Sequence, residues 1–327
     1  MSTIYGPVPS WRFGRSLGID IVLPPKTCTL DCIYCQLGST STKAVDETKG
    51  NIPDEVRVKS DLEAYLENVN LQTVDAVTFS GSGEPTLNPH LGEIAKEVRK
   101  LIGNKLLVIL TNATQLHKEK VRKRLVEFDM VVAKLDAGDE ETFRRLNRPK
   151  SKSITLKKVI NGIKKLKKEI DGQVALEVML LRTSNNYVSN VFGRSLKSLI
   201  KTAKSLNPDL IQLDIPYRPP SESYVKTPSD SEFKYAVDQF LREFNPEKLW
   251  VYGIHDMRDK KVKWKSGGDL ENRILTLLKR RPCTESDISN TLDIKKEKIQ
   301  IILKSLVEND KIQKQESKDK IYYLVKE

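Results

Sequence analysis

Three cysteines in one short stretch are the residues of this sequence best suited to chemistry. Cys28, Cys32 and Cys35 have the spacing C-x3-C-x2-C, whereas the fourth cysteine, Cys283, lies far downstream. A loop of this length can turn three sulfurs towards one inorganic centre. Three thiolates can bind three irons of a [4Fe-4S] cluster and leave the fourth iron open, whereas electron-transfer clusters usually have four cysteine ligands. An open coordination position indicates catalysis, as it does at zinc sites.

Zinc binding and disulfide formation are the alternatives for this motif. A structural zinc site needs a fourth ligand, and no nearby His or Cys in the sequence supplies one. Four cysteines in 327 residues are few for a disulfide-stabilised protein, and the clustering of three favours metal binding. We interpret Cys283 as an ordinary thiol at a helix boundary.

A glycine-rich turn is the second feature with chemical potential. Residues 80–87, SGSGEPTL, follow an apolar run at residues 74–79 that is typical of a buried strand. Gly83 allows the backbone to approach a ligand closely, and Glu84 can accept hydrogen bonds from an ammonium group. The turn therefore predicts a ligand-binding segment at the end of a strand.

Together these motifs resemble those of the radical S-adenosylmethionine (SAM) superfamily, including an aromatic residue, Tyr34, just before the last cysteine of the cluster motif. In that superfamily a GGE motif binds the amino group of SAM, and here Ser82 replaces its first glycine. The resemblance implies that the three cysteines bind a [4Fe-4S] cluster and that Gly83 and Glu84 bind SAM. It also implies that a reductant such as a ferredoxin or flavodoxin supplies an electron. SAM is then cleaved to methionine and a 5'-deoxyadenosyl radical, which abstracts hydrogen from the substrate.

Apolar runs alternating with helical patterns predict an α/β protein with a parallel sheet. Six strands are expected, and residues 249–254 are a candidate seventh. The six are residues 18–23, 74–79, 106–110, 130–135, 174–181 and 210–215. Eight strands would close a full barrel, so six leave an open, partial (β/α)6 TIM-type barrel, which is the fold that the resemblance implies.

Helix starts are predicted from local signals. Ser60 to Glu63 form a capping box, and Asn88 with Pro89 fits the N-cap and first position of the next helix. The lysine-rich residues 150–168 have apolar positions at helical spacing, which predicts an outer helix with a solvated lysine face.

Polar residues at the ends of the predicted strands are further candidates. The resemblance implies that Thr111, Asn112 and Asp136 contact the carboxylate or ribose of SAM, and Arg182 is a candidate to hold SAM or substrate. Asx turns, helix caps or surface exposure are the alternatives. Glu177 lies within an apolar strand, where an unpaired polar group costs about 2–7 kcal/mol, so we expect a ligand or an arginine as its partner.

Other segments near the same rim are candidates for substrate contacts. Asp214 and residues 216–220, PYRPP, end the sixth strand and could shape a substrate pocket. Arg145 and Arg148 could bind an anionic substrate or belong to an exposed structural loop. Residues 5–16 could cover the cluster, but we favour an ordered N-terminal arm.

The sequence changes in character after a basic linker at residues 257–268. We expect a barrel domain at residues 1–256 and a small domain at residues 269–327. Three helices, the third capped by Asp293, and a hairpin predict a winged helix. The first two helices are predicted at residues 270–279 and 284–292 and the hairpin at residues 312–316 and 321–325. The third helix has apolar residues at helical spacing, namely Ile299, Ile302, Leu303, Leu306 and Val307. This region has a net charge of only +2, which does not require DNA binding.

The whole chain has a net charge of +12, which favours polyanionic partners. The start of the sequence lacks the features of a signal peptide, and no apolar run reaches the roughly 18 residues of a membrane span, so we expect a cytoplasmic protein without a membrane partner.

The segments GPVPSWRFGRSLGID and PYRPP extend the resemblance to radical SAM Fe-S oxidoreductases grouped loosely with wyosine-type tRNA-modifying enzymes. This implies an RNA substrate such as tRNA. A radical SAM enzyme acting on a peptide or protein, and an iron-sulfur sensing DNA-binding regulator, are the alternatives.

Overall fold

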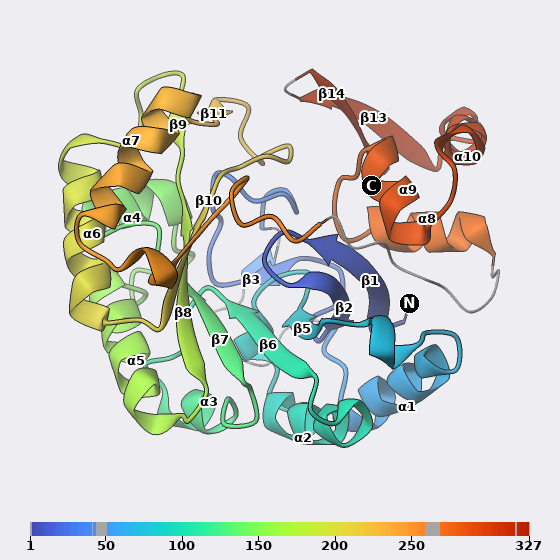
Figure 1. Ribbon diagram of the computed structural model, residues 1–327, viewed down its shortest axis with the longest axis horizontal. Coiled ribbons are helices and arrows are strands. Elements are labelled where there is room, and N and C mark those ends of the chain that lie inside the picture. The colour runs from blue at the N-terminus through green and yellow to red at the C-terminus, as the bar shows by residue number, and fades with distance from the viewer. Residues whose placement is uncertain (1, 41, 44–50, 259–268, 318, 327) are drawn as a thin grey trace.

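The computed structural model describes residues 2–40, 42–43, 51–258, 269–317 and 319–326. Its centre is an eight-stranded sheet in the order β1-β2-β5-β6-β7-β8-β10-β12, which curls into an open half-barrel (Figure 1). Only the pair β1 and β2 is antiparallel. The strands are β1 (Ile4–Ser10), β2 (Gly14–Asp20), β5 (Ala76–Ser80), β6 (Leu106–Thr111), β7 (Met130–Lys134), β8 (Gln173–Met179), β10 (Leu210–Asp214) and β12 (Leu249–Val251).

Helices cover the outer face of the half-barrel (Figure 1). They are α1 (Glu55–Leu66), α2 (Leu91–Ile102), α3 (Glu119–Lys123), α4 (Glu140–Asn147), α5 (Leu156–Glu169), α6 (Gly193–Leu206) and α7 (Asp230–Leu241). The lysine-rich helix is confirmed as α5, since its apolar residues Leu156, Val159 and Ile163 are buried against the sheet layer while most of its lysines are exposed. This amphipathic pattern is what fixes the helix on the sheet.

The predicted partial barrel is confirmed, with two differences at its ends. The candidate seventh strand exists as β12, and the N-terminal arm is itself a strand, β1, which pairs with β2. The first predicted strand, residues 18–23, in fact begins at Gly14 and ends at Asp20. The arm was hidden in the sequence because Pro7 and Pro9 disfavour a central strand, whereas an edge strand such as β1 tolerates proline.

Two predicted helix starts are wrong. Helix α1 begins at Glu55, where Asp54 accepts a hydrogen bond from the backbone N–H of Arg57 at 2.9 Å, so Ser60 lies inside the helix. Helix α2 begins at Leu91. Asn88 is buried and instead donates from Nδ2 to the carbonyls of Ile21 and Pro53, each at 2.9 Å. Asn88 therefore links its own loop by hydrogen bonds to the segments that contain Ile21 and Pro53.

The C-terminal region is the predicted winged helix. It contains α8 (Leu270–Leu278), α9 (Glu285–Leu292), α10 (Lys296–Glu308), β13 (Ile312–Ser317) and β14 (Lys320–Val325). Asp293 does not cap the third helix: it follows α9 with a φ of 53°, and α10 begins three residues later. Most of the predicted linker, residues 257–268, lies outside the described residues.

This region packs on the free edge of the sheet. Helices α8 and α9 lie against β1, and Val8 belongs to the apolar core of the winged helix (Figure 1). Arg280 reaches across to Asp20 at the end of β2, with 2.5 Å between Nε and Oδ2 and both side chains only 5% exposed. The winged helix and the barrel thus share a buried contact. None of the described helices is both long and apolar enough to cross a membrane.

Candidate functional site

The cysteine loop is fixed to the glycine-rich turn by backbone hydrogen bonds. Cys28 lies in the short strand β3 (Thr27–Cys28), which pairs with β4 (Thr42–Lys43). The N–H of Thr27 donates to Ser82 at 2.8 Å, and the N–H of Glu84 donates to the Thr27 carbonyl at 3.0 Å. A Cβ atom at Gly83 would lie 1.6 Å from that carbonyl oxygen, and Gly83 has a φ of +144°. Gly83 is therefore required for contact with the cysteine loop itself, a role that the sequence did not indicate.

The three cysteines of the motif line one cavity of about 260 Å³, here called the cysteine cavity. Each sulfur accepts a hydrogen bond from a different side chain. The donors are Asn112 Nδ2 to Cys28 at 3.4 Å, Asn147 Nδ2 to Cys32 at 3.5 Å, and Lys26 Nζ to Cys35 at 3.1 Å. Cys283 lies in the core of the winged helix and does not line this cavity.

The chemistry of this donor set fits an iron-sulfur cluster better than a single ion. Among the described residues, no three His, Cys, Asp or Glu side chains lie close enough to hold one metal ion. Ligands of one zinc ion would lie within about 4.6 Å of one another, given Zn–S bonds of about 2.3 Å. Ligands of a cluster bind different irons and stand further apart. The zinc alternative therefore loses support.

Burial disfavours the thiolate form of two of these cysteines, Cys28 and Cys32. It raises the pKa of Cys28, which the Glu84 carboxylate raises further, and it raises the pKa of Cys32 to about 11. A bound cationic centre would stabilise the thiolates and release their protons. The hydrogen bond from Asn147 acts in the same direction on Cys32, because it favours negative charge on the sulfur.

Glu84 is 1% exposed and lines the cysteine cavity. Its Oε1 accepts hydrogen bonds from the Thr86 N–H at 3.0 Å, the Thr86 hydroxyl at 2.5 Å and the Thr111 hydroxyl at 2.6 Å. Its Oε2 accepts one, from the Asn112 N–H at 2.7 Å. Burial nevertheless leaves the pKa of Glu84 above its usual value. The side of the carboxylate with spare acceptor capacity is Oε2.

Thr111 and Asn112 form hydrogen bonds with the residues of the site as well as lining its cavity. Thr111 uses its hydroxyl on Glu84, while Asn112 uses its backbone on Glu84 and its amide on Cys28 and on Thr29 Oγ1 at 2.9 Å. Both residues line the cysteine cavity. They therefore connect the cysteine loop to the end of β6, a role that the sequence did not predict; the expected contacts with SAM stay a prediction.

Asp136 lies behind Tyr34 and does not line the cysteine cavity. It accepts hydrogen bonds from the Tyr34 hydroxyl, from Asn147 Nδ2 at 2.8 Å and from the Met179 N–H at 2.8 Å. Asn147 also donates to Cys32, so Asp136 positions the cysteine loop through Asn147. Sequence reasoning missed Asn147, which lies between Arg145 and Arg148. The loop expected at residues 144–149 is wrong up to Asn147, because these residues form the end of α4.

A row of polar side chains crosses the inside of the half-barrel. Lys134, Glu177 and Gln212 are register neighbours on β7, β8 and β10. Arg12 and Lys134 form ion pairs with Glu177 at 3.0 Å and 3.3 Å, which confirms that an arginine is among the partners of this carboxylate. Burial would raise the pKa of Glu177, but these two cations lower it to about 2. The lysine was missed, although a lysine within an apolar strand carries the same signal as the glutamate.

The segment after β10 also reaches the cysteine cavity, as its position predicted. Asp214 accepts a hydrogen bond from Trp11 Nε1 at 3.3 Å, which joins the N-terminal arm to this rim. Tyr217 and Arg218 line the cavity, with the Arg218 guanidinium 4.6 Å from the centroid of the Tyr217 ring. The N-terminal arm is thus ordered and, through Arg12, also covers the cavity.

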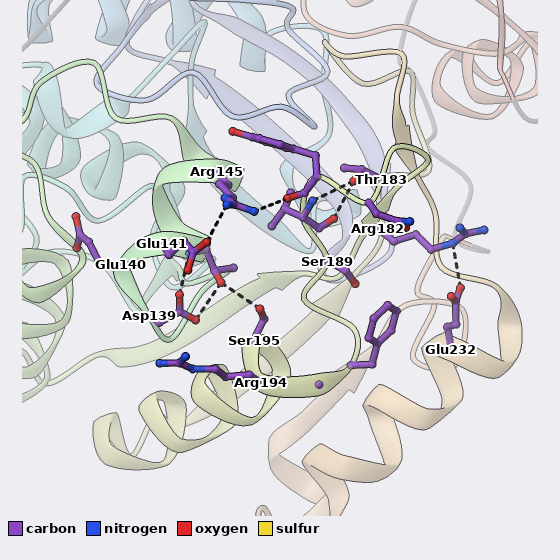
Figure 2. A pocket seen from close by; sticks show the side chains of 16 residues that line it. Asp139, Glu140, Glu141, Arg145, Arg182, Thr183, Ser189, Arg194, Ser195 and Glu232 are labelled. Carbon is purple, nitrogen blue, oxygen red and sulfur yellow. Dashed lines mark hydrogen bonds and ion pairs between the residues drawn. The ribbon is translucent and has the colours of Figure 1, made fainter.

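Arg182 lies in a different hollow, of about 760 Å³ (Figure 2). There it pairs with Glu232, with 3.2 Å between the charged atoms, and Arg145 lines the same hollow. Arg148 forms ion pairs with Asp31 at 3.2 Å and with Glu222. Neither Arg182, Arg145 nor Arg148 lines the cysteine cavity.

The chain belongs to the radical SAM superfamily, whose profile matches residues 22–187. It is therefore an enzyme of the radical SAM class, which uses a [4Fe-4S] cluster and SAM and needs an external reductant. Residues 273–326 match a second family, the sugar-specific transcriptional regulator TrmB. This match agrees with the winged-helix fold of the region.

Among its relatives, the chain is 32% identical to the UPF0026 protein MJ1312 of Methanocaldococcus jannaschii, over 99% of this chain and 96% of that protein. It is 39% identical to the UPF0026 protein slr1464 of Synechocystis, over 66% of this chain and 76% of that protein. It is also 33% identical to a protein of Brachyspira hyodysenteriae named GTPase Obg, over 95% of this chain but only 43% of that protein. The present sequence contains no G-x4-G-K-S/T motif, so the phosphate-binding loop of such GTPases is not in this chain.

Two solved structures are distantly similar to this chain. SuiB of Streptococcus suis, bound to SAM, is 18% identical with a TM-score of 0.48, over 72% of this chain and 50% of SuiB. Coproporphyrinogen III oxidase (HemN) of Escherichia coli, a radical SAM enzyme, is 12% identical with a TM-score of 0.42, over 94% of this chain and 85% of HemN. The family assignment rests on the sequence matches, not on these distant likenesses.

Proposed function

We propose that this protein binds a [4Fe-4S] cluster through Cys28, Cys32 and Cys35 and cleaves SAM at its open iron. The observation that carries the proposal is that these three thiols line one cavity with Glu84, whereas Cys283 lies elsewhere. When bound, the reduced cluster and SAM supply a 5'-deoxyadenosyl radical, which abstracts hydrogen from a substrate.

The residues around the cavity have distinct tasks in this proposal. Glu84 accepts the amino group of SAM on Oε2, since Oε1 is already occupied by three donors. Thr111 and the Asn112 backbone keep the carboxylate in place. Asn112 and Asn147 also donate to cysteine sulfurs, which stabilises negative charge there. Asp136 positions Tyr34 and Asn147 instead of touching SAM.

The buried ion group of Arg12, Lys134 and Glu177 sets the polarity of the cavity wall. It contributes two cations and one carboxylate to the wall. Arg218, Glu84 and Asp214 also line the cavity, so three basic side chains face three acidic ones there. Fixed charges of this kind orient polar ligands without reorganisation. We assign no contact with SAM to Arg182, because it lies in the other hollow and pairs with Glu232.

The proposal is tested by an anaerobic assay. The cluster is reconstituted and reduced with dithionite, SAM is added, and 5'-deoxyadenosine is measured. We expect the nucleoside from the wild type and from Cys283→Ala, but not from Cys32→Ala. The matched cysteine outside the cavity controls for general loss of thiols. Wild-type protein with an intact cluster but no affinity for SAM would refute the proposal.

For the substrate, we infer an RNA such as tRNA before a peptide or protein. The support is the net charge of +12 together with the sequence resemblance described above. Binding of labelled tRNA should be strongest at low salt, where phosphate contacts are least screened. Failure to bind at low salt would contradict an RNA substrate and favour a peptide.

For the compartment, the free thiols and the cluster suit a reducing environment such as the cytoplasm.

A redox-sensing regulator is the second candidate, favoured by the match of residues 273–326 to a transcriptional regulator. Lysines at positions 295, 296, 298 and 304 are exposed on or next to α10, the helix that would face DNA. A sensor has no need of Glu84. If Glu84→Ala abolished SAM cleavage, the enzyme would be supported; if DNA binding responded to the cluster and was unchanged in Glu84→Ala, the sensor would be.

A further inference from the structure

A second cavity, of about 170 Å³, lies between the N-terminal strands, the end of the cysteine loop and the turn that follows α8. We call it the arginine cavity, because four arginines line it and only one carboxylate does. The arginines are Arg12, Arg218, Arg280 and Arg281, and the carboxylate is Asp20. Asp20 is already paired with Arg280, and Arg12 pairs with Glu177 of the cysteine cavity at 3.0 Å. The positive charges of Arg218 and Arg281 therefore have no carboxylate partner in the cavity wall.

Three of these arginines have an unused donor. The Nε atoms of Arg12, Arg218 and Arg281 are buried, and none of them has a hydrogen-bond partner among the described residues. Other atoms of Arg218 are engaged: Nη1 donates to Gln36 Oε1 at 3.2 Å and to the Tyr217 hydroxyl at 2.7 Å. A buried N–H without an acceptor is unfavourable. Three such donors at one cavity indicate a ligand rich in acceptors.

Asp287 lies outside the cavity wall and interacts electrostatically with Arg218 and Arg281. Burial would raise its pKa, but Arg218 and Arg281 lower it below the usual value. Its Oδ2 is committed to Thr284, accepting from the backbone N–H at 2.9 Å and from the hydroxyl at 3.0 Å. Asp287 therefore offsets part of the positive charge but supplies no acceptor to the Nε atoms.

The arginine cavity adjoins the cysteine cavity. Arg12, Gln36, Tyr217 and Arg218 line both. A group bound among the arginines would therefore lie next to the cysteine cavity. The opposite wall comes from the winged-helix region, through Arg280 and Arg281.

We propose that the arginine cavity binds a phosphate group of the substrate. A phosphate offers acceptor oxygens in several directions, which suits guanidinium groups converging from different elements and the nearby hydroxyls of Ser10 and Ser82. A carboxylate has only two oxygens, in one plane, and would leave part of these donors unused. The inference rests on the proposed function for the reaction that follows binding, but not for binding itself.

The test is calorimetric titration of the cluster-loaded protein with inorganic phosphate under anaerobic conditions. We expect saturable binding by the wild type and a loss of at least about tenfold in affinity in Arg281→Met and in Arg218→Met, because each removes a charged donor. Lys279→Met is the matched control: it removes the same charge two residues away at an exposed position, and should bind as the wild type does. Iron content and circular dichroism show that each variant is folded and loaded.

Three results would overturn the proposal: no saturable phosphate binding by the wild type, equal affinity in both arginine variants and the wild type, or acetate binding as tightly as phosphate. Glycerol 3-phosphate and a ten-nucleotide RNA distinguish the two sources of phosphate. A gain in affinity for the first supports a small phosphomonoester, and a gain for the second supports a nucleic acid. The 5'-deoxyadenosine assay is read separately, so failure of phosphate binding is distinguishable from failure of SAM cleavage.

Discussion

The ion pair between Arg280 and Asp20 gives the sharpest prediction for the contact between the winged helix and the barrel. Arg280→Met keeps the length and apolar stem of the side chain but removes the guanidinium. That group pairs with Asp20, donates to the Ser2 carbonyl at 2.7 Å and to the Thr276 carbonyl at 2.9 Å, and lies 4.5 Å from the centroid of the Tyr5 ring. The substitution leaves a carboxylate buried without its cation.

The expected cost is about 3–5 kcal/mol, which is typical of removing one partner of a buried pair. At about 2 °C per kcal/mol for a chain of this size, the melting temperature should fall by about 6–10 °C. The exposed pair of Arg144 and Glu140, with both side chains 42% exposed, provides the control. Arg144→Met should cost less than about 1 kcal/mol.

The assay is calorimetry at a fixed scan rate on the wild type, Arg280→Met, Asp20→Asn and the double variant. Because the double variant has no unpaired buried charge, it should be more stable than the sum of the single effects predicts, by about 1–3 kcal/mol. Strictly additive losses would refute the reasoning, since they would mean that the two groups do not interact.

A pH series makes the same test independently. Burial already raises the pKa of Asp20, and Arg280 opposes this rise. Without the arginine, the pKa of Asp20 in the folded state should rise further above its unfolded value, so the folded state binds more protons than the unfolded state. The stability deficit of Arg280→Met should then shrink as the pH falls from 7 towards 5. A deficit that does not change with pH would contradict a buried, unpaired carboxylate.

Three further predictions concern the cysteine cavity. Glu177→Gln leaves two buried cations without their carboxylate and should lower the free energy of unfolding by about 3–5 kcal/mol. Since the pKa of Glu177 is about 2, the stabilisation by its carboxylate is present above about pH 4.5 and lost towards pH 2. The difference in stability between variant and wild type should therefore close in acid-unfolding curves. Thr111→Val removes one donor to Glu84 and should weaken SAM binding about three- to tenfold in titrations, with iron content unchanged; unaltered affinity would mean that Thr111 does not position the carboxylate. Cys283→Ala should retain full iron content by elemental analysis, and a loss of about one quarter of the iron would reveal an unexpected ligand.

The strands and the location of the site were predictable because buried parallel strands are nearly continuous apolar runs. Polar residues that follow such runs collect at one rim, and this brought the cysteine loop, Glu84, Thr111 and Asn112 together. The partners of these residues were not predictable. That three donors would converge on Glu84 Oε1 depends on the turn conformation after Gly83, which in turn depends on the carbonyl of Thr27.

Charged residues were the least predictable part of the site. Arg280 stands in the basic run Lys279-Arg280-Arg281, which in a sequence is indistinguishable from a solvated turn, yet it is buried against Asp20. Lys134 could have been found by the rule applied to Glu177, since a charge within an apolar strand needs a partner. The role of Arg12 could not have been found in this way, because its partner Glu177 is far away in the sequence and their contact depends on the edge strand β1.

The position of the winged helix explains why its loss would be a poor test of substrate recognition. Strand β1 is the edge of the sheet, and an uncovered edge invites pairing with other chains. Helices α8 and α9 cover it, and Arg280 neutralises the carboxylate at the end of β2. Removing residues 269–327 would therefore expose the edge and leave Asp20 unpaired, in addition to removing Arg281. Substitution of Arg281 alone separates recognition from support, because its side chain is not needed to cover β1, whereas α10 and its lysines stay available to any further partner.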